Sequence, residues 1–127
     1  TSNVTVKSGS FSGIFDAIDN FASGTSTNPQ NTIVEYLIQA YQQDSDGSWT
    51  DDYQSQKILL AHRGTNNGND MLIQEYAIML RNNKVVDFTM SYGFIGNDGV
   101  NSYFLNAFKA SGISGTVYYK FTRTILA

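Results

Sequence analysis

An alternating run of residues in the second half of the chain places the strongest constraint on the fold. Within residues 85–95, apolar side chains occupy every second position: Val86, Phe88, Met90, Tyr92 and Phe94. Side chains along a strand point alternately to opposite faces, so this period of two predicts a strand with one buried face. Residues 71–80 form a second apolar run, and Asn82 and Asn83, which tolerate positive φ, suit a type I′ turn between the runs. We therefore expect an antiparallel hairpin here.

Four further segments are rich in β-branched or aromatic residues and are predicted as strands: 3–7, 32–42, 53–62 and 116–125. In the last of these, Tyr118, Lys120, Thr122 and Thr124 are expected to face solvent. Successive antiparallel strands alternate in direction. The loops at 44–53 and 81–84 should therefore share one end of the sheet, and those at 63–70 and 96–101 the other.

Two segments show a helical spacing instead. In residues 10–22, apolar side chains recur at i, i+3, i+4 and i+7: Phe11, Ile14, Phe15, Ile18 and Phe21. In residues 102–110, Phe104, Leu105 and Phe108 form a shorter stripe, which Gly112 would end. The expected fold is mainly β, and α+β in detail. It is an antiparallel twisted sheet, or a partly closed barrel or sandwich, with two short helices packed on one face or end.

Composition excludes several classes of protein. The 127 residues are expected to form a single domain, 1–127. The net charge is −3 and the basic residues are scattered, which disfavours a nucleic-acid partner. No apolar run reaches the ~18 residues of a membrane-spanning segment. The absence of cysteine rules out disulfides and thiol chemistry. Only 15% of residues are charged, which suggests an extracellular location or a cell or virion surface.

The loops after the strand at 53–62 are the first candidate binding site. Their polar residues are His62, Arg63, Asn66, Asn67, Asn69 and Asp70, joined by Asn97 and Asp98. Amide and carboxylate groups on short loops match the directional hydrogen bonds that sugar hydroxyls need. We therefore expect lectin-like carbohydrate recognition, although the same residue types are common in ordinary turns.

The opposite end carries aspartates around the only tryptophan, Trp49. They are Asp44, Asp46, Asp51 and Asp52, and Arg81 and Lys84 are expected nearby. The D-x-D-G run resembles part of a calcium loop, so calcium is the one cofactor considered. The alternative is a hairpin turn at Asp46-Gly47 with solvated or ion-paired aspartates. Trp49 is either a lid on the core or an exposed surface on which a sugar ring or a partner stacks, and it is included among the ligand-binding candidates.

The sequence does not predict an enzyme, since no nucleophile elbow or phosphate-binding loop is present. His62 and Arg63 are the remaining catalytic candidates, for a small hydrolase or nuclease-like activity in which Asp70 or Asp98 orients His62. Glu35 and Glu75 are also considered as a glycosidase pair.

The eight tyrosines favour a different function. Tyrosine is enriched at protein interfaces. The terminal strand, if it lies at a sheet edge, could pair with another copy. The alternative hypothesis is thus a self-assembling structural or toxin-like subunit, a homo-oligomer whose partner is a protein surface rather than a carbohydrate.

Overall fold

The computed structural model describes residues 4–25, 32–62, 71–94 and 100–126, and in these ranges all regular structure is β-strand. The strands, in chain order, are β1 (Val4–Phe11), β2 (Phe15–Thr25), β3 (Thr32–Gln43), β4 (Trp49–His62), β5 (Met71–Arg81), β6 (Val86–Phe94), β7 (Val100–Lys109) and β8 (Thr116–Leu126). Within these ranges no helix is long and apolar enough to cross a membrane.

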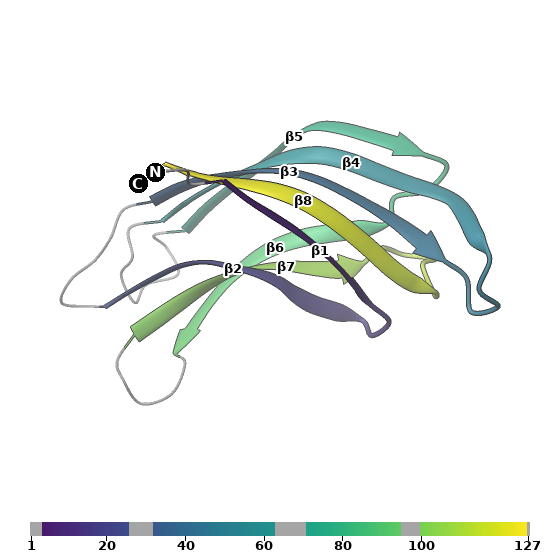
Figure 1. The fold of residues 1–127 in the computed structure, drawn as a ribbon, viewed down its shortest axis with the longest axis horizontal. Coiled ribbons are helices and arrows are strands. Elements are labelled where there is room, and N and C mark those ends of the chain that lie inside the picture. Colours follow the sequence, from purple (N-terminus) through teal and green to yellow (C-terminus); the bar gives the residue numbers. More distant parts are fainter. Residues whose placement is uncertain (1–3, 26–31, 63–70, 95–99, 127) are drawn as a thin grey trace.

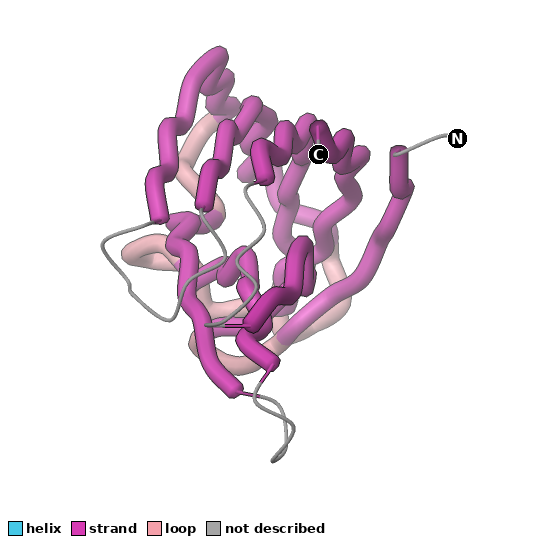
Figure 2. Tube along the Cα trace, turned by 90° about the vertical axis from the view of Figure 1, so that its left-hand side faces the viewer, coloured by secondary structure: helices cyan, strands magenta, loops and turns pink. Residues whose placement is uncertain are grey.

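The strands form two antiparallel sheets that lie in two layers (Figure 1). The larger sheet has the order β1-β8-β3-β4-β5 and the smaller one the order β2-β7-β6. A view turned by 90° shows the same two layers with every regular element drawn as strand (Figure 2). Because β8 pairs with both β1 and β3, the prediction that the terminal strand is an edge was wrong. The edges of the larger sheet are β1 and β5.

The core lies between the two layers. Alternate residues of β3, β4 and β8 point inward, and the buried ones include Val34, Tyr36, Ile38, Ile58, Leu60, Val117 and Phe121. The smaller sheet contributes Ile18, Phe21, Val86, Tyr103 and Leu105. This period of two is the pattern of facing sheets that share one apolar interior. The strands predicted in residues 3–7, 32–42, 53–62, 71–80, 85–95 and 116–125 are present as β1, β3, β4, β5, β6 and β8.

The helix predicted for residues 10–22 is absent, and strand β2 occupies most of that segment. Its pairing with β7 shifts register between Ala17 and Asp19 and again between Asn20 and Ala22. Each shift is a β-bulge, in which β2 has one extra residue without a partner in β7. The inserted residues are Ile18 and Phe21, both fully buried. The bulges thus hold apolar side chains three residues apart on one face, and that spacing imitates a helix.

The helix predicted for residues 102–110 is also absent, and strand β7 occupies nearly all of it. Tyr103, Leu105 and Ala107 alternate toward the core, where each is buried. Phe104 and Phe108 are on the opposite face of this central strand, where the Phe108 ring stacks on Phe15 with centroids 5.1 Å apart. Both faces of β7 carry large apolar residues, so its sequence shows no clean alternation.

The predicted hairpin between residues 71–80 and 85–95 does not form, because β5 and β6 belong to different sheets. A type I′ turn needs positive φ at both central residues. Asn82 has a φ of 64°, but Asn83 does not have a positive φ. The chain instead turns a corner between the layers. The side-chain oxygen Oε1 of buried Gln54 accepts hydrogen bonds from the amides of Val85 (2.9 Å) and Val86 (3.0 Å), which fixes the start of β6.

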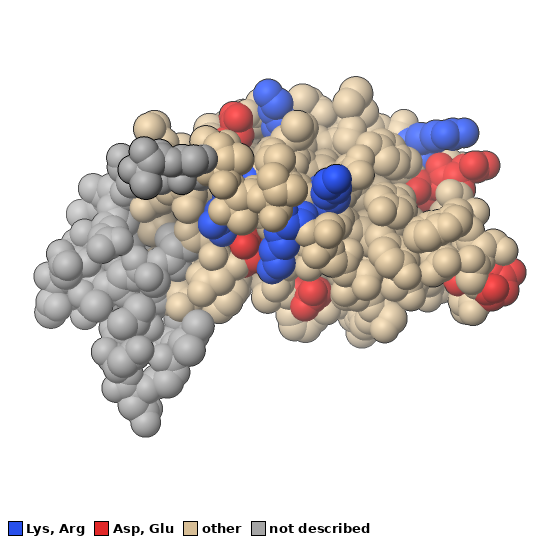
Figure 3. All heavy atoms as spheres, viewed as in Figure 1, with Lys and Arg blue, Asp and Glu red and all other residues tan. Residues whose placement is uncertain are grey.

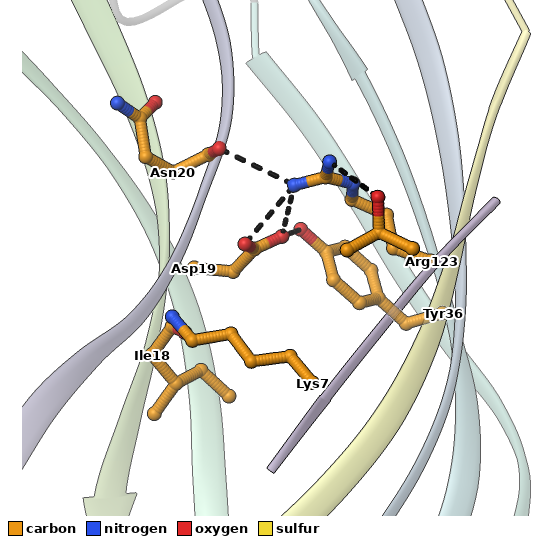
Figure 4. A network of polar contacts seen from close by, with 7 residues as sticks. Lys7, Ile18, Asp19, Asn20, Tyr36 and Arg123 are labelled. Atoms are coloured by element: carbon orange, nitrogen blue, oxygen red, sulfur yellow. Dashed lines mark hydrogen bonds and ion pairs between the residues drawn. The ribbon is translucent and has the colours of Figure 1, made fainter. Parts of the chain in front are cut away.

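A buried polar network joins the two layers (Figure 4). Arg123 of β8 donates to both carboxylate oxygens of Asp19 in β2, at 2.9 and 3.0 Å. Tyr36 of β3 donates to the same carboxylate at 2.7 Å. Burial, followed by the negative charge of Asp19, raises the pKa of Tyr36, so its hydroxyl stays protonated and donating. Lys7 of β1 donates to the Ile18 carbonyl at 2.6 Å. The network fixes how the two sheets face each other.

Candidate functional site

The outer face of the larger sheet carries side chains in ordered rows across β8, β3 and β4. Antiparallel pairing aligns Tyr41 with both Tyr118 and Tyr53, which gives an aromatic row. The next row toward the sheet centre contains Lys120, Gln39 and Ser55, aligned in the same way. Side chains of directly opposed residues are neighbours on one face of a sheet. An aromatic row therefore lies beside a polar row.

Trp49 extends the aromatic row at the start of β4. Its ring lies 5.1 Å from Tyr118 in an edge-on contact and 5.6 Å from Tyr41, and the Tyr41 and Tyr118 rings stack at 5.9 Å. We call these three residues the aromatic cluster. Trp49 is 59% exposed although its neighbours fix it in place. The expectation that it is a lid on the core was wrong, and the alternative of an exposed stacking surface fits its position.

Hydrogen bonds orient the polar side chains next to this cluster. The Tyr53 hydroxyl donates to Oε1 of Gln39 at 2.8 Å. The amide nitrogen of Gln39 therefore points away from Tyr53 and can donate to another group. The Tyr118 hydroxyl donates to Oε1 of Gln43 at 3.1 Å. Side chains held by such contacts lose less freedom when a ligand binds.

A shallow groove of about 410 Å³ lies over the polar row. Its outward-pointing lining residues are Leu37, Gln39, Tyr53, Ser55, Lys120 and Thr122. Tyr53 belongs to the aromatic row, so the groove begins where the aromatic cluster ends. The volume is within the ordinary range for small-molecule sites, and the lining combines apolar surface with a few polar groups, as such sites do.

The aspartates near Trp49 have separate surroundings. Figure 3 shows acidic side chains gathered at the end of the molecule farthest from the grey residues. Asp46 accepts a hydrogen bond from the Ser48 amide (2.9 Å) within the turn, and this bond lowers its pKa. Gly47 has a φ of 89°, so the hairpin turn expected at Asp46-Gly47 is present. Asp51 lies 3.9 Å from Arg81 on the surface.

Asp52 is buried and holds the connection between β5 and β6 against the larger sheet at this end. It accepts hydrogen bonds from the side chains of Gln42 (2.8 Å), Asn82 (2.6 Å) and Asn83 (3.1 Å). Burial alone would raise the pKa of Asp52, but these hydrogen bonds outweigh it and lower the pKa below its ordinary value. Among the described residues no group of three or more Asp, Glu or His side chains could hold a metal ion, and the four aspartates of the calcium hypothesis form no such group. Of the two basic residues expected near these aspartates, Arg81 lies 3.9 Å from Asp51, whereas Lys84 pairs with Asp87 at 2.7 Å.

His62, the only histidine, points into the interior rather than toward a ligand. It is 4% exposed, and its ring stacks on Tyr103 with centroids 4.2 Å apart. Neither ring nitrogen has a hydrogen-bond partner among the described residues. Burial lowers its pKa, so the ring is neutral. This environment suits a core residue better than a general base.

The other residues expected to form a site with His62 lie outside the described ranges: Arg63, Asn66, Asn67, Asn69, Asp70, Asn97 and Asp98. Their assignment to a binding or catalytic site stays a prediction. Glu35 and Glu75 do not form a pair, because they occupy opposite faces of the larger sheet. Glu35 points outward and accepts a hydrogen bond from the Tyr76 hydroxyl (2.6 Å), whereas Glu75 accepts from the buried Gln56 (2.9 Å).

Strand β5 presents a second unusual surface. Five of its large apolar side chains are exposed: Leu72, Ile73, Ile78, Met79 and Leu80. They point to both faces of the strand, and β5 pairs only with β4, so one edge of its backbone is open. Exposed apolar edge strands are uncommon in monomers and mark interaction surfaces.

Sequence reasoning identified Trp49 but missed Gln39, Ser55, Lys120 and Thr122. A usable signal was present in residues 32–43, where Glu35, Leu37, Gln39, Tyr41 and Gln43 alternate with buried residues. That alternation defines an outer face. What sequence alone lacked was the strand order, which places β8 beside β3 and so aligns Lys120 with Gln39.

The fold is an antiparallel two-sheet β-sandwich whose larger sheet carries aromatic and polar side chains on its outer face. No protein-family model matches the chain, and no curated protein matches it. Among solved structures the chain is similar to the tailspike protein of Acinetobacter baumannii phage AM24, with 14% sequence identity and a TM-score of 0.45 over 97% of this chain. The chain spans about a quarter of that tailspike chain, namely 26% of it.

Proposed function

We propose that the chain is a carbohydrate-binding domain that stacks a sugar ring on the aromatic cluster. The observation that carries this proposal is Trp49, which is 59% exposed yet held in edge contact with Tyr118. Leaving so large an apolar ring in water is unfavourable unless something covers it. The apolar face of a sugar ring is one such cover, because it offers C–H groups to the ring and hydroxyls to its surroundings.

The polar row supplies the directional part of the recognition. Gln39, Ser55 and Thr122 present amide and hydroxyl groups in the groove next to the stacked ring. Such groups donate and accept hydrogen bonds without adding charge, which suits vicinal hydroxyls. The site lies on sheet strands rather than on the loops around residues 63–70, where lectin-like binding was first expected. A domain of this kind belongs outside the cell or on a cell or virion surface.

The test is a titration of the whole chain with a panel of soluble polysaccharides, followed by the fluorescence of its single tryptophan. We expect at least one polysaccharide to shift the emission and to bind with a measurable affinity. Trp49→Ala should reduce that affinity at least about tenfold, measured by affinity electrophoresis because the fluorophore is lost. Leu72→Ala is the matched control, since it also removes an exposed apolar side chain, but on β5. Equal losses in the two variants would contradict the proposal, as would a panel in which nothing binds.

A second candidate function is self-assembly through β5. The five exposed apolar residues of that strand and its open edge favour it, because a strand from a second copy would cover both. Light scattering at low micromolar concentration should then show an oligomer that Leu72→Lys or Met79→Lys dissociates. A monomer at every concentration would remove this candidate and leave the carbohydrate proposal intact.

A further inference from the structure

We propose that the ligand of the groove is an acidic polysaccharide, whose sugar carboxylate pairs with Lys120. This inference rests on the proposed carbohydrate-binding function and specifies the chemical class of its ligand. It requires that Lys120 be free to bind, that no carboxylate of the protein compete for it, and that the stacked sugar place a carboxylate within its reach.

Lys120 differs from the other basic side chains in the described part of the chain. Arg123 pairs with Asp19, Lys84 with Asp87 and Arg81 with Asp51. Lys7 and Lys109 donate to the backbone carbonyls of Ile18 and Ser12. Lys57 lies over the Tyr76 ring, 6.0 Å from its centroid. Lys120 is exposed at the groove and forms no ion pair with any described residue.

Among the residues that the structure describes, no carboxylate lines the groove. The outward-pointing carboxylates of β3 and β4 are Glu35, which accepts a hydrogen bond from Tyr76, and Asp51, which lies 3.9 Å from Arg81. An acidic protein with a net charge of −3 thus keeps in this groove a cation that forms no ion pair with a described residue. That arrangement is complementary to an anionic ligand and not to a cationic one.

The spacing suits a chain of sugar units. Lys120 lies two residues from Tyr118 on the same face of β8, a distance of about 7 Å along the strand. A ring stacked on the aromatic cluster therefore has its neighbour over the polar row. A carboxylate on either unit is within reach of the flexible Lys120 side chain, while Gln39 and Ser55 meet the hydroxyls.

The experiment compares uronate-containing polysaccharides with their carboxyl-reduced forms, in which each carboxylate has become a neutral hydroxymethyl group. The polymers are polygalacturonate, alginate and hyaluronate. We expect the native form of at least one polymer to bind more tightly than its reduced form. Lys120→Gln should weaken binding to that native polymer about 2- to 5-fold, because an exposed ion pair contributes up to about 1 kcal/mol and each 1.4 kcal/mol is tenfold. The same variant should leave binding to the reduced form unchanged.

Lys84→Gln is the matched control, because it removes the same charge at a position outside the groove. Raising the salt concentration from 50 to 300 mM should weaken native-polymer binding in the wild type and in Lys84→Gln, but less in Lys120→Gln. Equal affinity for native and reduced polymers, with Trp49 still required, would overturn the acidic-ligand proposal and leave carbohydrate binding standing. Equal effects of Lys120→Gln and Lys84→Gln would also overturn it, by showing an effect of net charge only. If neither native, reduced nor neutral polymers bind, both proposals fail.

Discussion

Arg123 of β8 and Asp19 of β2 form an ion pair between the two sheets, with Arg123 Nη1 2.9 Å from Asp19 Oδ2. The side chains are 15% and 6% exposed, so both charges are largely removed from water. Such a pair compensates its own desolvation only when both members are present. Tyr36 and Thr5 add hydrogen bonds to the same two groups, which makes this the main polar contact between the layers.

Replacing Asp19 by Ala should therefore lower the free energy of unfolding by about 3–5 kcal/mol, since Arg123 would be left as an unpaired buried charge. Urea denaturation followed by circular dichroism measures this. Asp51→Ala serves as the comparison, because its pair with Arg81 is 76% and 82% exposed and should change stability by less than about 1 kcal/mol. Similar losses in the two variants would show that the inter-sheet pair is not important for stability.

Gln54 holds the corner between the sheets through the amides of Val85 and Val86. Gln54→Leu keeps the size of the side chain but leaves both buried amides without an acceptor. Each such group costs about 1–3 kcal/mol, so we expect a loss of about 2–6 kcal/mol in unfolding free energy. Gln74→Leu, at an exposed position on β5, should change it by no more than about 0.5 kcal/mol. An intact Gln54→Leu domain with wild-type stability would refute this role.

Ala77 lies at the bulge of β5 with a φ of 53°. A left-handed conformation costs a non-glycine residue roughly 1–2 kcal/mol, whereas glycine adopts it freely. Ala77→Gly should thus stabilise the protein by up to about 1 kcal/mol, after allowing for the larger entropy of glycine in the unfolded chain. Ala61→Gly on β4, which has no positive φ, should instead destabilise by about 0.5–1 kcal/mol. Thermal unfolding distinguishes the two signs.

His62 should make stability depend on pH. Its pKa in the folded protein is lowered from the ordinary value of 6.5, so the unfolded chain binds the proton more tightly. The stabilisation is complete above pH 6.5 and is lost as the pH falls from 6.5 through the folded pKa. His62→Phe keeps a ring against Tyr103 and removes the titration. Between pH 7 and 5 the wild type should lose more unfolding free energy than this variant, and parallel curves would contradict the expected shift.

The sequence correctly predicted strands that have one buried face and one face exposed to solvent, as in residues 32–42 and 116–125. It failed where the strand itself is irregular. The bulges that insert Ile18 and Phe21 produce a three-residue spacing, and no property of one strand reveals that its partner skips a residue. Residues 102–110 failed for another reason, because β7 is covered by aromatic rings on its outer face as well.

The candidate site was partly predictable for related reasons. Trp49 and the tyrosines are recognisable by type, and an exposed stacking role for Trp49 was one of two expectations. The role proposed for Lys120 depends on its position beside Gln39. The two residues are neighbours only because β8 lies between β1 and β3. The hairpin predicted at Asn82–Asn83 does not form, because the buried acceptors Asp52 and Gln54 bind the residues that follow β5. These acceptors are about 30 positions earlier in the chain, so the local sequence does not reveal them.

The central place of β8 has a consequence for how the protein is made. The larger sheet has a gap between β1 and β3 until residues 116–126 have been synthesised, and neither the β1–β8 nor the β3–β8 pairing can form before then. Pairings this distant in sequence are slow to form, so we expect the larger sheet to fold only once β8 has emerged from the ribosome, on the millisecond-to-second scale of β-rich domains. During that interval the exposed flank of β3 is open to other nascent chains. A chaperone or rapid assembly would be most valuable at that stage.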